Sequence, residues 1–503
     1  MTAPPDDAGS RGDDVHTEPG VDFEIQVSQN KYRSPTDTGM AAVLTVTSHG
    51  HDAAASVAAP VDAAVVILVD CSGSMAYPPL KMSAAQKATA AAIEAVRDGT
   101  RFAIVAGTDT ARMVYPLTME MAVADPETRH AATRAVHHLF ASGGTAMGTW
   151  LALADTLLER HPGLVRHAIL LTDGINQHET AATLEQVLAT CQGHFVCDAR
   201  GIGEDWDHHQ LLRITQVLRG SAEAIGHPGD LVADFQAVIG RTMHRQVPTL
   251  RVRVWTVPGV RVRALRQETP TLTDLTEHAR TVDERTTEFD TGSWAGEEDR
   301  EFLLDLAIAF RVDDTPADIG EDLLAARVDL VVDGARRGDP RPVVVHWTDD
   351  LVASTRIDAG VARATGQEAL SAAIADGCDA LLDGDLPTAT DHFQSAHDMA
   401  RTLGATEILR RLDGLVDVGG DGRVRVRGGW NRSALLRVAV SSVMFPGDDG
   451  HDDGGVDQAP GTPAAGPDLR CPGCERLWPP GTPACEACRQ PLVPVIGPDD
   501  ADD

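Results

Sequence analysis

Three uninterrupted apolar runs constrain most strongly what this chain can fold into. They occupy residues 64–69, 102–106 and 167–171. A strand that is apolar on both faces must be covered on both, as in a parallel sheet between two layers of helices. Helices are predicted between and after these runs, at residues 83–96, 127–139 and 181–188. Strand and helix therefore alternate about every 30 residues, as in βαβ units. The pattern predicts a doubly wound, mostly parallel α/β domain over residues 61–245.

The segment that follows is rich in strands and turns instead. Strands are predicted at residues 250–257, 260–266, 301–309, 325–332 and 342–347. No long helix is expected between them, so residues 246–358 are predicted to form a β-sandwich. Residues 22–50 contain two further strand-like runs, 23–29 and 42–48, with no partners of their own. Our hypothesis is that these strands join the sandwich and that the α/β domain is inserted between them.

The ends of the chain are simpler. Residues 1–21 are polar and acidic and are predicted to be a disordered tail. Residues 361–440 are predicted to be helical, with one helical hairpin of the tetratricopeptide type formed by residues 368–382 and 389–403. Residues 446–468 are a linker rich in Gly, Asp and Pro, and a short cysteine module follows at residues 469–492.

Charge and apolar patterning limit the partners and the compartment. The chain has 75 acidic and 43 basic residues, a net charge of -32. Nucleic acids and anionic membranes would be repelled by such a surface, so neither is expected as a partner. No export signal is visible, and the longest apolar run is far too short to span a membrane. We therefore expect a cytoplasmic protein with reduced thiols.

Oxygen-bearing side chains follow the first apolar strand. Asp70 ends that strand, and Ser72 and Ser74 lie in the turn before the next helix. Ligands of open α/β sheets bind at the carboxyl ends of the strands. A carboxylate and two hydroxyls at alternate positions are hard ligands, suited to Mg²⁺ or Mn²⁺. The alternative is a purely structural role, in which such serines cap the start of a helix.

At this point the chain resembles a known family. The string Asp70-x-Ser72-x-Ser74 is similar to the metal-ion-dependent adhesion site (MIDAS) of von Willebrand factor A (VWA) domains, which have a Rossmann-like fold. Residues 142–148 match the second loop of that site and residues 170–174 match the third. The resemblance therefore implies Thr145 and Asp173 as further ligands. It also implies that the metal coordinates an Asp or Glu carboxylate of a partner protein, without catalysis.

The cysteine module points to a second metal. Cys471, Cys474, Cys485 and Cys488 have the spacing C-x2-C-x10-C-x2-C. Two such pairs can hold one Zn²⁺ tetrahedrally, and four sulfur ligands make the site structural. The segment resembles zinc ribbons at the ends of bacterial regulatory proteins, and its few basic residues favour a protein contact.

Other candidate ligands have ordinary explanations. Cys71, inside the serine motif, is interpreted as a small buried residue. The adjacent histidines His137-His138 and His208-His209 have no third ligand at a telling spacing. They are interpreted as solvated or packed residues.

The leading functional prediction is a non-enzymatic scaffold or adaptor that binds proteins through its metal. Similar multidomain actinobacterial chains look like accessory components of signalling systems. Possible partners are then Ser/Thr kinases, phosphatases or phosphopeptide-binding proteins. The alternative is the substrate-engaging subunit of a complex with a chelatase-like ATPase. The motifs of nucleotide-binding loops, zinc proteases and serine hydrolases are absent from the sequence, and the missing export signal argues against a surface adhesin.

Overall fold

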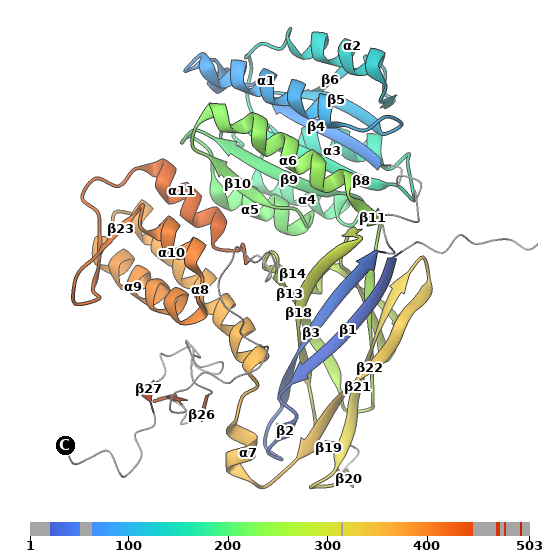
Figure 1. The fold of residues 1–503 in the computed structure, drawn as a ribbon, viewed down its shortest axis with the longest axis vertical. Helices are drawn as coiled ribbons and strands as arrows, with labels where there is room; N and C mark the ends of the chain where they lie inside the picture. The colour runs from blue at the N-terminus through green and yellow to red at the C-terminus, as the bar shows by residue number, and fades with distance from the viewer. Residues whose placement is uncertain are drawn as a thin grey trace, which may run out of the picture.

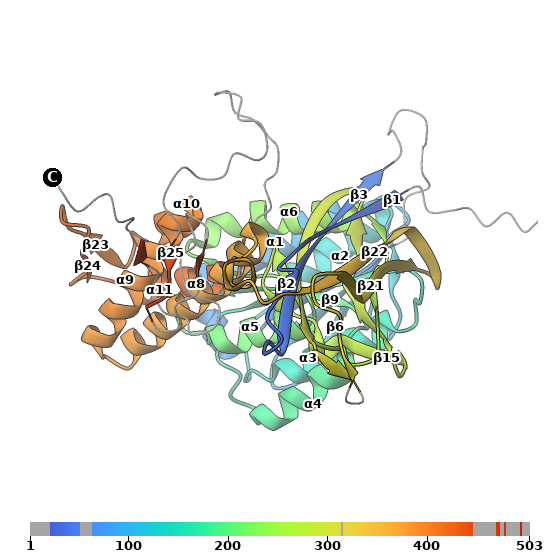
Figure 2. The ribbon, with the colours of Figure 1, turned by 90° about the horizontal axis from the view of Figure 1, so that it is seen from below.

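The computed structural model describes residues 21–50, 63–312, 315–445, 469–472, 477–478 and 493–494. It contains an α/β domain, a β-sandwich and a helical region (Figure 1). In the view from below, the helical region stands to one side of the other two parts (Figure 2). The linker predicted at 446–468, residues 1–20 of the predicted tail and most of the cysteine module lie outside the described residues.

The α/β domain is built on one seven-stranded sheet. Its strand order is β10-β9-β8-β4-β5-β6, with β7 paired to β5. The strands are β4 (Ala63–Asp70), β5 (Arg101–Gly107), β6 (Ala111–Tyr115), β7 (Ala122–Val123), β8 (Val165–Thr172), β9 (Val196–Ile202) and β10 (Ala222–Ile225). The first five strands in this order run parallel, whereas β6 and β7 are antiparallel to β5. The predicted mostly parallel sheet is confirmed.

Helices cover both faces of this sheet. The helices are α1 (Leu80–Ala95), α2 (Pro126–Val136), α3 (Met147–Leu158), α4 (Ala181–Cys191), α5 (His208–Val217) and α6 (Leu231–Met243). On β4, Val65, Ile67 and Val69 pack with α1, α2 and α6. The alternate residues Ala64, Val66 and Leu68 pack with α3, α4 and α5. This two-sided burial is why β4 is apolar at every position before Asp70.

Two sheets form the sandwich around one core. One sheet has the order β1-β3-β18-β13-β14 and the other β15-β16-β12-β21-β22-β2. The strands of the first are β1 (Val21–Gln29), β3 (Gly39–Gly50), β13 (Arg261–Thr269), β14 (Thr273–Asp274) and β18 (Glu297–Ala307). Those of the second are β2 (Tyr32–Arg33), β12 (Arg251–Thr256), β15 (Ala279–Asp283), β16 (Thr286–Asp290), β21 (Asp322–Val332) and β22 (Ala335–Trp347). Strands β1 and β3 thus lie in one sheet with strands from beyond the α/β domain.

The remaining strands form small sheets of two or three short strands. They are β11 (Arg245–Val247) with β17 (Trp294–Ala295), β19 (Arg311–Val312) with β20 (Thr315–Pro316), and β23 (Val416–Val418) with β24 (Val424–Val426). In the cysteine module β25 (Leu469–Arg470) pairs with β26 (Leu477–Trp478) and β27 (Val493–Pro494).

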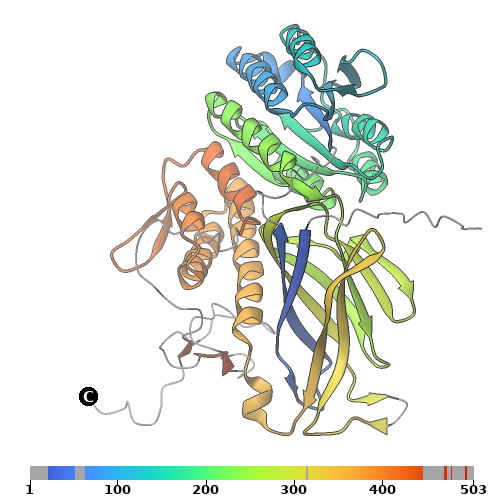
Figure 3. The ribbon, with the colours of Figure 1, turned by 45° about the vertical axis from the view of Figure 1, so that its right-hand side comes forward.

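The helical region packs against both other parts. Its helices are α7 (Leu351–Thr355), α8 (Ala359–Leu382), α9 (Leu386–Leu403), α10 (Thr406–Leu412) and α11 (Arg432–Ser441). Helix α8 runs beside β1 and β3 of the sandwich (Figure 3). Helix α11 places Leu436 and Val440 in the core of the α/β domain. Among the helices that the structure describes, none has the length and apolar character needed to cross a membrane.

The segment between the sandwich and the helical region contains a short helix. The last sandwich strand ends at Trp347, as predicted for that strand, and α7 lies between it and residue 358. Helix α7 begins after Asp350 and α8 after Asp358, and each of these carboxylates accepts hydrogen bonds from two backbone N–H groups of its helix. The aspartates end the extended chain because they satisfy the free donors of a helix start.

Candidate metal centre

Strand β4 delivers Asp70 to the carboxyl edge of the central sheet, where its side chain is fully buried. Its Oδ1 accepts a hydrogen bond from the Ser72 backbone N–H at 2.7 Å, and its Oδ2 accepts one from Thr172 Oγ1 at 2.7 Å. Thr172 is the last residue of β8, the strand beside β4. Strand pairing therefore fixes the position of this carboxylate.

The hydroxyls of Ser72 and Ser74 lead from the first loop to the second carboxylate, Asp173. Ser72 Oγ lies 2.9 Å from Ser74 Oγ, and Ser74 Oγ donates to Asp173 Oδ1 at 2.6 Å. Ser72 precedes the short 3-10 helix η1 (Gly73–Ala76), but its side chain makes no capping hydrogen bond within the described part of the chain. Capping therefore does not explain the serine at position 72.

The loop that contains Thr145 reaches the same place. The Gly73 N–H donates to Gly143 O at 3.0 Å, which holds this loop against the first one. A Cβ atom placed on Gly174 would lie 3.3 Å from both Ser74 Oγ and Thr145 Oγ1. The two hydroxyls therefore flank Gly174. The structure brings the side chains from all three loops together at this point.

Lys81, on α1, is the charged residue at this site that sequence reasoning missed. Its side chain is only 7% exposed, and its Nζ lies 2.7 Å from Asp173 Oδ2 and 3.5 Å from Asp205 Oδ2. The sequence did contain a signal, because Lys81 is one of three lysines in the chain and follows the serine motif closely. The site thus contains one ammonium group that lies between the carboxylates of Asp173 and Asp205.

The electrostatics of the site fit a cation. Burial is the largest effect on Asp70 and raises its pKa to about 6, although hydrogen bonds from Ser72 and Thr172 lower it. Among the described residues no cationic side chain contacts this buried carboxylate. Carboxylate and hydroxyl oxygens are the ligands that Mg²⁺ and Mn²⁺ prefer. A dication here would offset the cost of burying the charge of Asp70.

Cys71 is a buried residue beneath the loop, as predicted. Its side chain is 1% exposed, and burial raises the pKa of its thiol to about 12. A thiol with this pKa stays protonated and unreactive at neutral pH.

The two histidine pairs differ from each other. His137 and His138 are both exposed, as expected for solvated residues. His208 is buried, and His209 Nε2 lies 2.9 Å from Asp379 Oδ1. No local spacing indicates Asp379 as a third ligand, because it lies 170 residues further along the chain.

Of the four predicted zinc ligands, the structure describes Cys471. It is buried and packs with Val43 and Leu303 of the sandwich and with Val361 of α8. The other three, Cys474, Cys485 and Cys488, lie outside the described residues.

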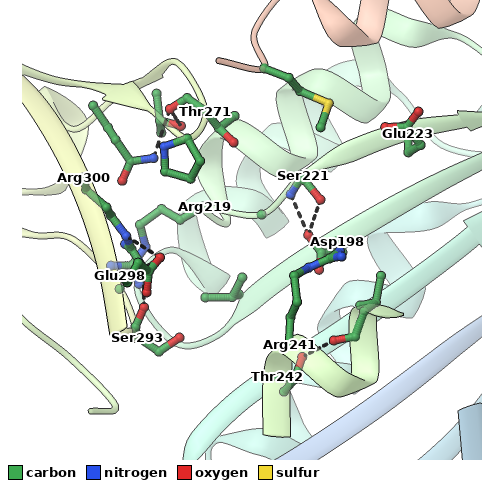
Figure 4. A pocket seen from close by; sticks show the side chains of 18 of the residues that line it. Asp198, Arg219, Ser221, Glu223, Arg241, Thr242, Thr271, Ser293, Glu298 and Arg300 are labelled. Carbon is green, nitrogen blue, oxygen red and sulfur yellow. Dashed lines mark hydrogen bonds and ion pairs between the residues drawn. The ribbon is translucent and has the colours of Figure 1, made fainter. Parts of the chain in front are cut away.

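A cavity of about 660 Å³ lies where the three parts of the molecule meet (Figure 4). Charged side chains line it, and ion pairs there cross between the parts. Arg219 of the α/β domain contacts Asp290 of the sandwich, and Arg411 of α10 lies 3.4 Å from Glu223 of β10. Both arginines already form ion pairs with carboxylates of another part of the molecule. We therefore interpret the cavity as part of the junction between the domains and not as a ligand site.

Known proteins share this architecture. Residues 63–224 match the sequence family described as von Willebrand factor type A domain. The chain is 35% identical to the solved structure of von Willebrand factor type A from Catenulispora acidiphila, over 86% of this chain and 98% of that one, with a TM-score of 0.78. The ArnB paralog VWA2 from Sulfolobus acidocaldarius is 13% identical over 84% of this chain and 98% of its own, with a TM-score of 0.50. No curated protein matches the sequence.

Proposed function

Because this chain belongs to the von Willebrand factor type A family, we propose that it binds a divalent cation and uses it to hold a partner protein. The cation would be Mg²⁺ or Mn²⁺, and it would supply a coordination position for an Asp or Glu side chain of the partner. The ligands that we assign are Asp70, Ser72, Ser74, Thr145 and Asp173. The chain itself would catalyse no reaction.

One observation carries the proposal. The Ser72 N–H donates to Asp70, and the Ser72 and Ser74 hydroxyls are hydrogen-bonded in turn to Asp173, across two loops that are 99 residues apart. A helix cap or an ordinary turn does not require this arrangement. The oxygens are of the kind that a hard cation prefers.

The charge balance supports an acidic side chain as the partner's group. Asp70, Asp173 and Asp205 contribute three negative charges, and Lys81 contributes one positive charge. A bound dication would bring the charge of this group to about zero, in a protein whose net charge is -32. The site would therefore accept a carboxylate that the rest of the surface repels.

An exposed apolar side chain lies within a few residues of the proposed ligands in each of the three segments of the chain that supply them. Tyr77 is 82% exposed and lies three residues after Ser74, Phe140 is 63% exposed, and Ile175 is 38% exposed and lies two residues after Asp173. All three loops of the site thus carry an apolar residue open to solvent. Aromatic and apolar groups around a polar centre are typical of the residues that dominate protein interfaces.

The wider role that we propose is that of a scaffold or adaptor in the cytoplasm. The partners that fit the resemblance are Ser/Thr kinases, phosphatases or phosphopeptide-binding proteins. In this proposal Cys471, Cys474, Cys485 and Cys488 hold a structural Zn²⁺, which stabilises a module too short to fold by itself.

Affinity capture tests the proposal. The full chain is used as bait in Mg²⁺ and in EDTA, together with Asp70→Ala, Asp173→Ala and the control Glu94→Ala. Glu94 is an exposed carboxylate on α1, so its removal changes the net charge equally. We expect a partner that is retained by the wild type and by Glu94→Ala in Mg²⁺ only. Recovery of the same proteins in every condition would contradict the proposal.

A second variant separates metal binding from partner binding. Tyr77→Ala removes an exposed ring and none of the proposed ligands. It should leave the affinity for Mg²⁺ unchanged and lower the affinity for the partner by about tenfold, the effect of losing an interface residue of moderate importance. If the captured partner is an ATPase and its retention depends on nucleotide, the chelatase-like alternative replaces the signalling role.

A further inference from the structure

A second group of potential metal ligands lies between α5 and α8, away from the oxygen site. His208 and His209 are the first two residues of α5, and the carboxylate of Asp207 fixes this helix start by accepting from the His209 N–H at 2.9 Å. Asp379 lies near the end of α8. The group therefore joins the α/β domain to the helical region.

The three side chains converge on one point. His209 Nε2 lies 2.9 Å from Asp379 Oδ1, and His208 Nε2 lies 3.8 Å from the same oxygen. The three candidate ligand atoms are all within 4.8 Å of one another. Ligand atoms of a tetrahedral Zn²⁺ with bonds of about 2.0–2.1 Å are roughly 3.3 Å apart. Small side-chain movements would thus give metal-binding geometry.

The buried histidine gives independent evidence for a ligand. His208 is 3% exposed, and its Nε2 has no hydrogen-bond partner among the described residues. A buried polar atom without a partner costs free energy and needs an explanation. The 3.8 Å separation from Asp379 is too long for a hydrogen bond. Burial also lowers the pKa of His208 to about 4, so its ring is neutral and has a lone pair to give.

An ion pair alone does not account for this arrangement. The contact between His209 and Asp379 would explain those two side chains and leave His208 Nε2 unpaired. One cation bonded to both imidazoles and the carboxylate satisfies all three groups. Two nitrogen ligands and one oxygen ligand suit Zn²⁺ and not Mg²⁺. His209 and Asp379 are 59% and 45% exposed, so an ion and a water ligand can reach the site.

We propose that His208, His209 and Asp379 form a Zn²⁺ site that fastens α5 to α8. The site uses none of the oxygen ligands around Asp70, so this proposal does not depend on the proposed function. Zn²⁺ bound here links two parts of the chain that are 170 residues apart, and it thereby stabilises the docking of the helical region on the α/β domain.

Zn²⁺ titration of the full chain tests this site. Excess Mg²⁺ is present throughout to occupy the oxygen site, and the cysteine module is intact in every variant. Zn²⁺ uptake at these two places is therefore the same in all the proteins compared. We expect His209→Ala and Asp379→Asn each to bind one equivalent of Zn²⁺ fewer than the wild type, with affinity at the lost site at least about 100-fold weaker. Loss of a direct ligand should exceed the 10–100-fold effect of removing a group behind a ligand.

Matched controls exist for both side chains. His138→Ala removes an exposed histidine of the other pair, and Asp376→Asn removes an exposed carboxylate on α8. Both should bind Zn²⁺ like the wild type. Wild-type stoichiometry and affinity in His209→Ala and Asp379→Asn would overturn the proposal. These two residues are partly exposed, so their variants should fold.

Hydrogen exchange gives a second measurement. Added Zn²⁺ should slow amide exchange at the start of α5 and near Asp379 in the wild type. The same regions should show no Zn²⁺ effect in Asp379→Asn. Equal protection in both proteins would contradict a metal bridge at this place.

Discussion

Asp70 couples metal binding to pH, because burial raises its pKa to about 6. This value lies above the ordinary 3.8, so ionised Asp70 makes the metal-free folded chain less stable as the pH rises from about 4 to 6. A bound cation favours the ionised form and offsets this cost. Below pH 6 a proton therefore competes with the metal at Asp70.

We expect Mg²⁺ to bind about tenfold more weakly at pH 5 than at pH 7, because the ionised fraction of a group with a pKa near 6 falls about tenfold over that range. Isothermal titration of the full chain at both pH values measures this ratio. Asp70→Asn has no proton to lose at this position and should bind weakly at both. Equal wild-type affinities at pH 5 and pH 7 would show that Asp70 is not a ligand.

Lys81 has the opposite effect, since its ammonium group lies 2.7 Å from Asp173 and repels a cation at the same site. Lys81→Met removes this repulsion and should increase Mg²⁺ affinity by about tenfold. It also leaves Asp173 Oδ2 without its donor, so the melting temperature in EDTA should fall.

Lys87→Met is the matched control, because Lys87 is exposed on the same helix. Titration calorimetry and thermal unfolding of both variants make the comparison. An unchanged affinity in Lys81→Met would show that Lys81 does not repel the cation, and a lower affinity would show that Lys81 supports the metal site.

Asp70, Ser72 and Ser74 could be proposed from the sequence because they form a short local motif at the end of a strand, whereas Thr145 and Asp173 were implied by the family resemblance. Lys81 and Asp379 were missed for a different reason. The role of Lys81 depends on which face of α1 turns toward the sheet edge, and that of Asp379 on how α8 docks against α5. Neither depends on local spacing.

At the scale of elements, the contact of α3 with the central sheet depends on a glycine. A Cβ on Gly107, the last residue of β5, would lie 2.3 Å from two atoms of the Trp150 ring. The Trp150 side chain is fully buried, and its Nε1 donates to Thr108 O at 2.7 Å. The ring therefore has no room to retreat.

Gly107→Ala should lower the free energy of unfolding by about 3 kcal/mol, at the upper end of the cost of overpacking. Gly240→Ala is the control, because a Cβ there meets no atom of the described residues within 4 Å and Gly240 lies inside α6. It should stabilise the chain by about 0.5 kcal/mol, since alanine favours the helix. Urea denaturation of both variants measures the two effects. Similar values for the two would contradict the packing argument.

The ends of elements were predicted less well than their centres. Strand β22 begins at Ala335, well before the predicted residue 342, because its first residues are exposed and charged and carry no apolar alternation. The Asp333-Gly334 dipeptide is itself a turn signal in the sequence. In the structure these two residues have positive φ of 50° and 80° and join β21 to β22 in a two-residue turn. Burial patterns identify the core of a strand and say little about its exposed end.

At the scale of the whole molecule, the sandwich is assembled from two distant segments. Strand β3 pairs with β18 from Gly39 opposite Ala307 to His49 opposite Glu297. The first segment also contributes apolar side chains to the core. They are Val21, Phe23, Ile25, Met40, Ala42, Leu44 and Val46. At about 1.5 kcal/mol each, their burial is worth roughly 10 kcal/mol, which is comparable to the stability of a whole domain.

The strand content of both segments could be predicted from alternating apolar residues. Their pairing was a hypothesis, because register between segments about 250 residues apart is set by the folded core and by no local signal. The structure also shows where the inserted α/β domain joins the sandwich. Gly50 lies against Gly296, and Arg245 pairs with the adjacent Ala295, so the two ends of the insertion meet at one place.

This geometry makes the dependence of the sandwich on its first segment testable. Residues 245–366 alone should not fold, since β18 loses β3, one of its two neighbours, and the core loses about 10 kcal/mol of burial. Residues 21–50 joined to 245–366 by a short Gly-Ser linker should fold, because the joined ends already lie together. Circular dichroism and thermal unfolding compare the two chains. Cooperative unfolding of residues 245–366 alone would mean that β1 and β3 only cover a sandwich that is stable without them.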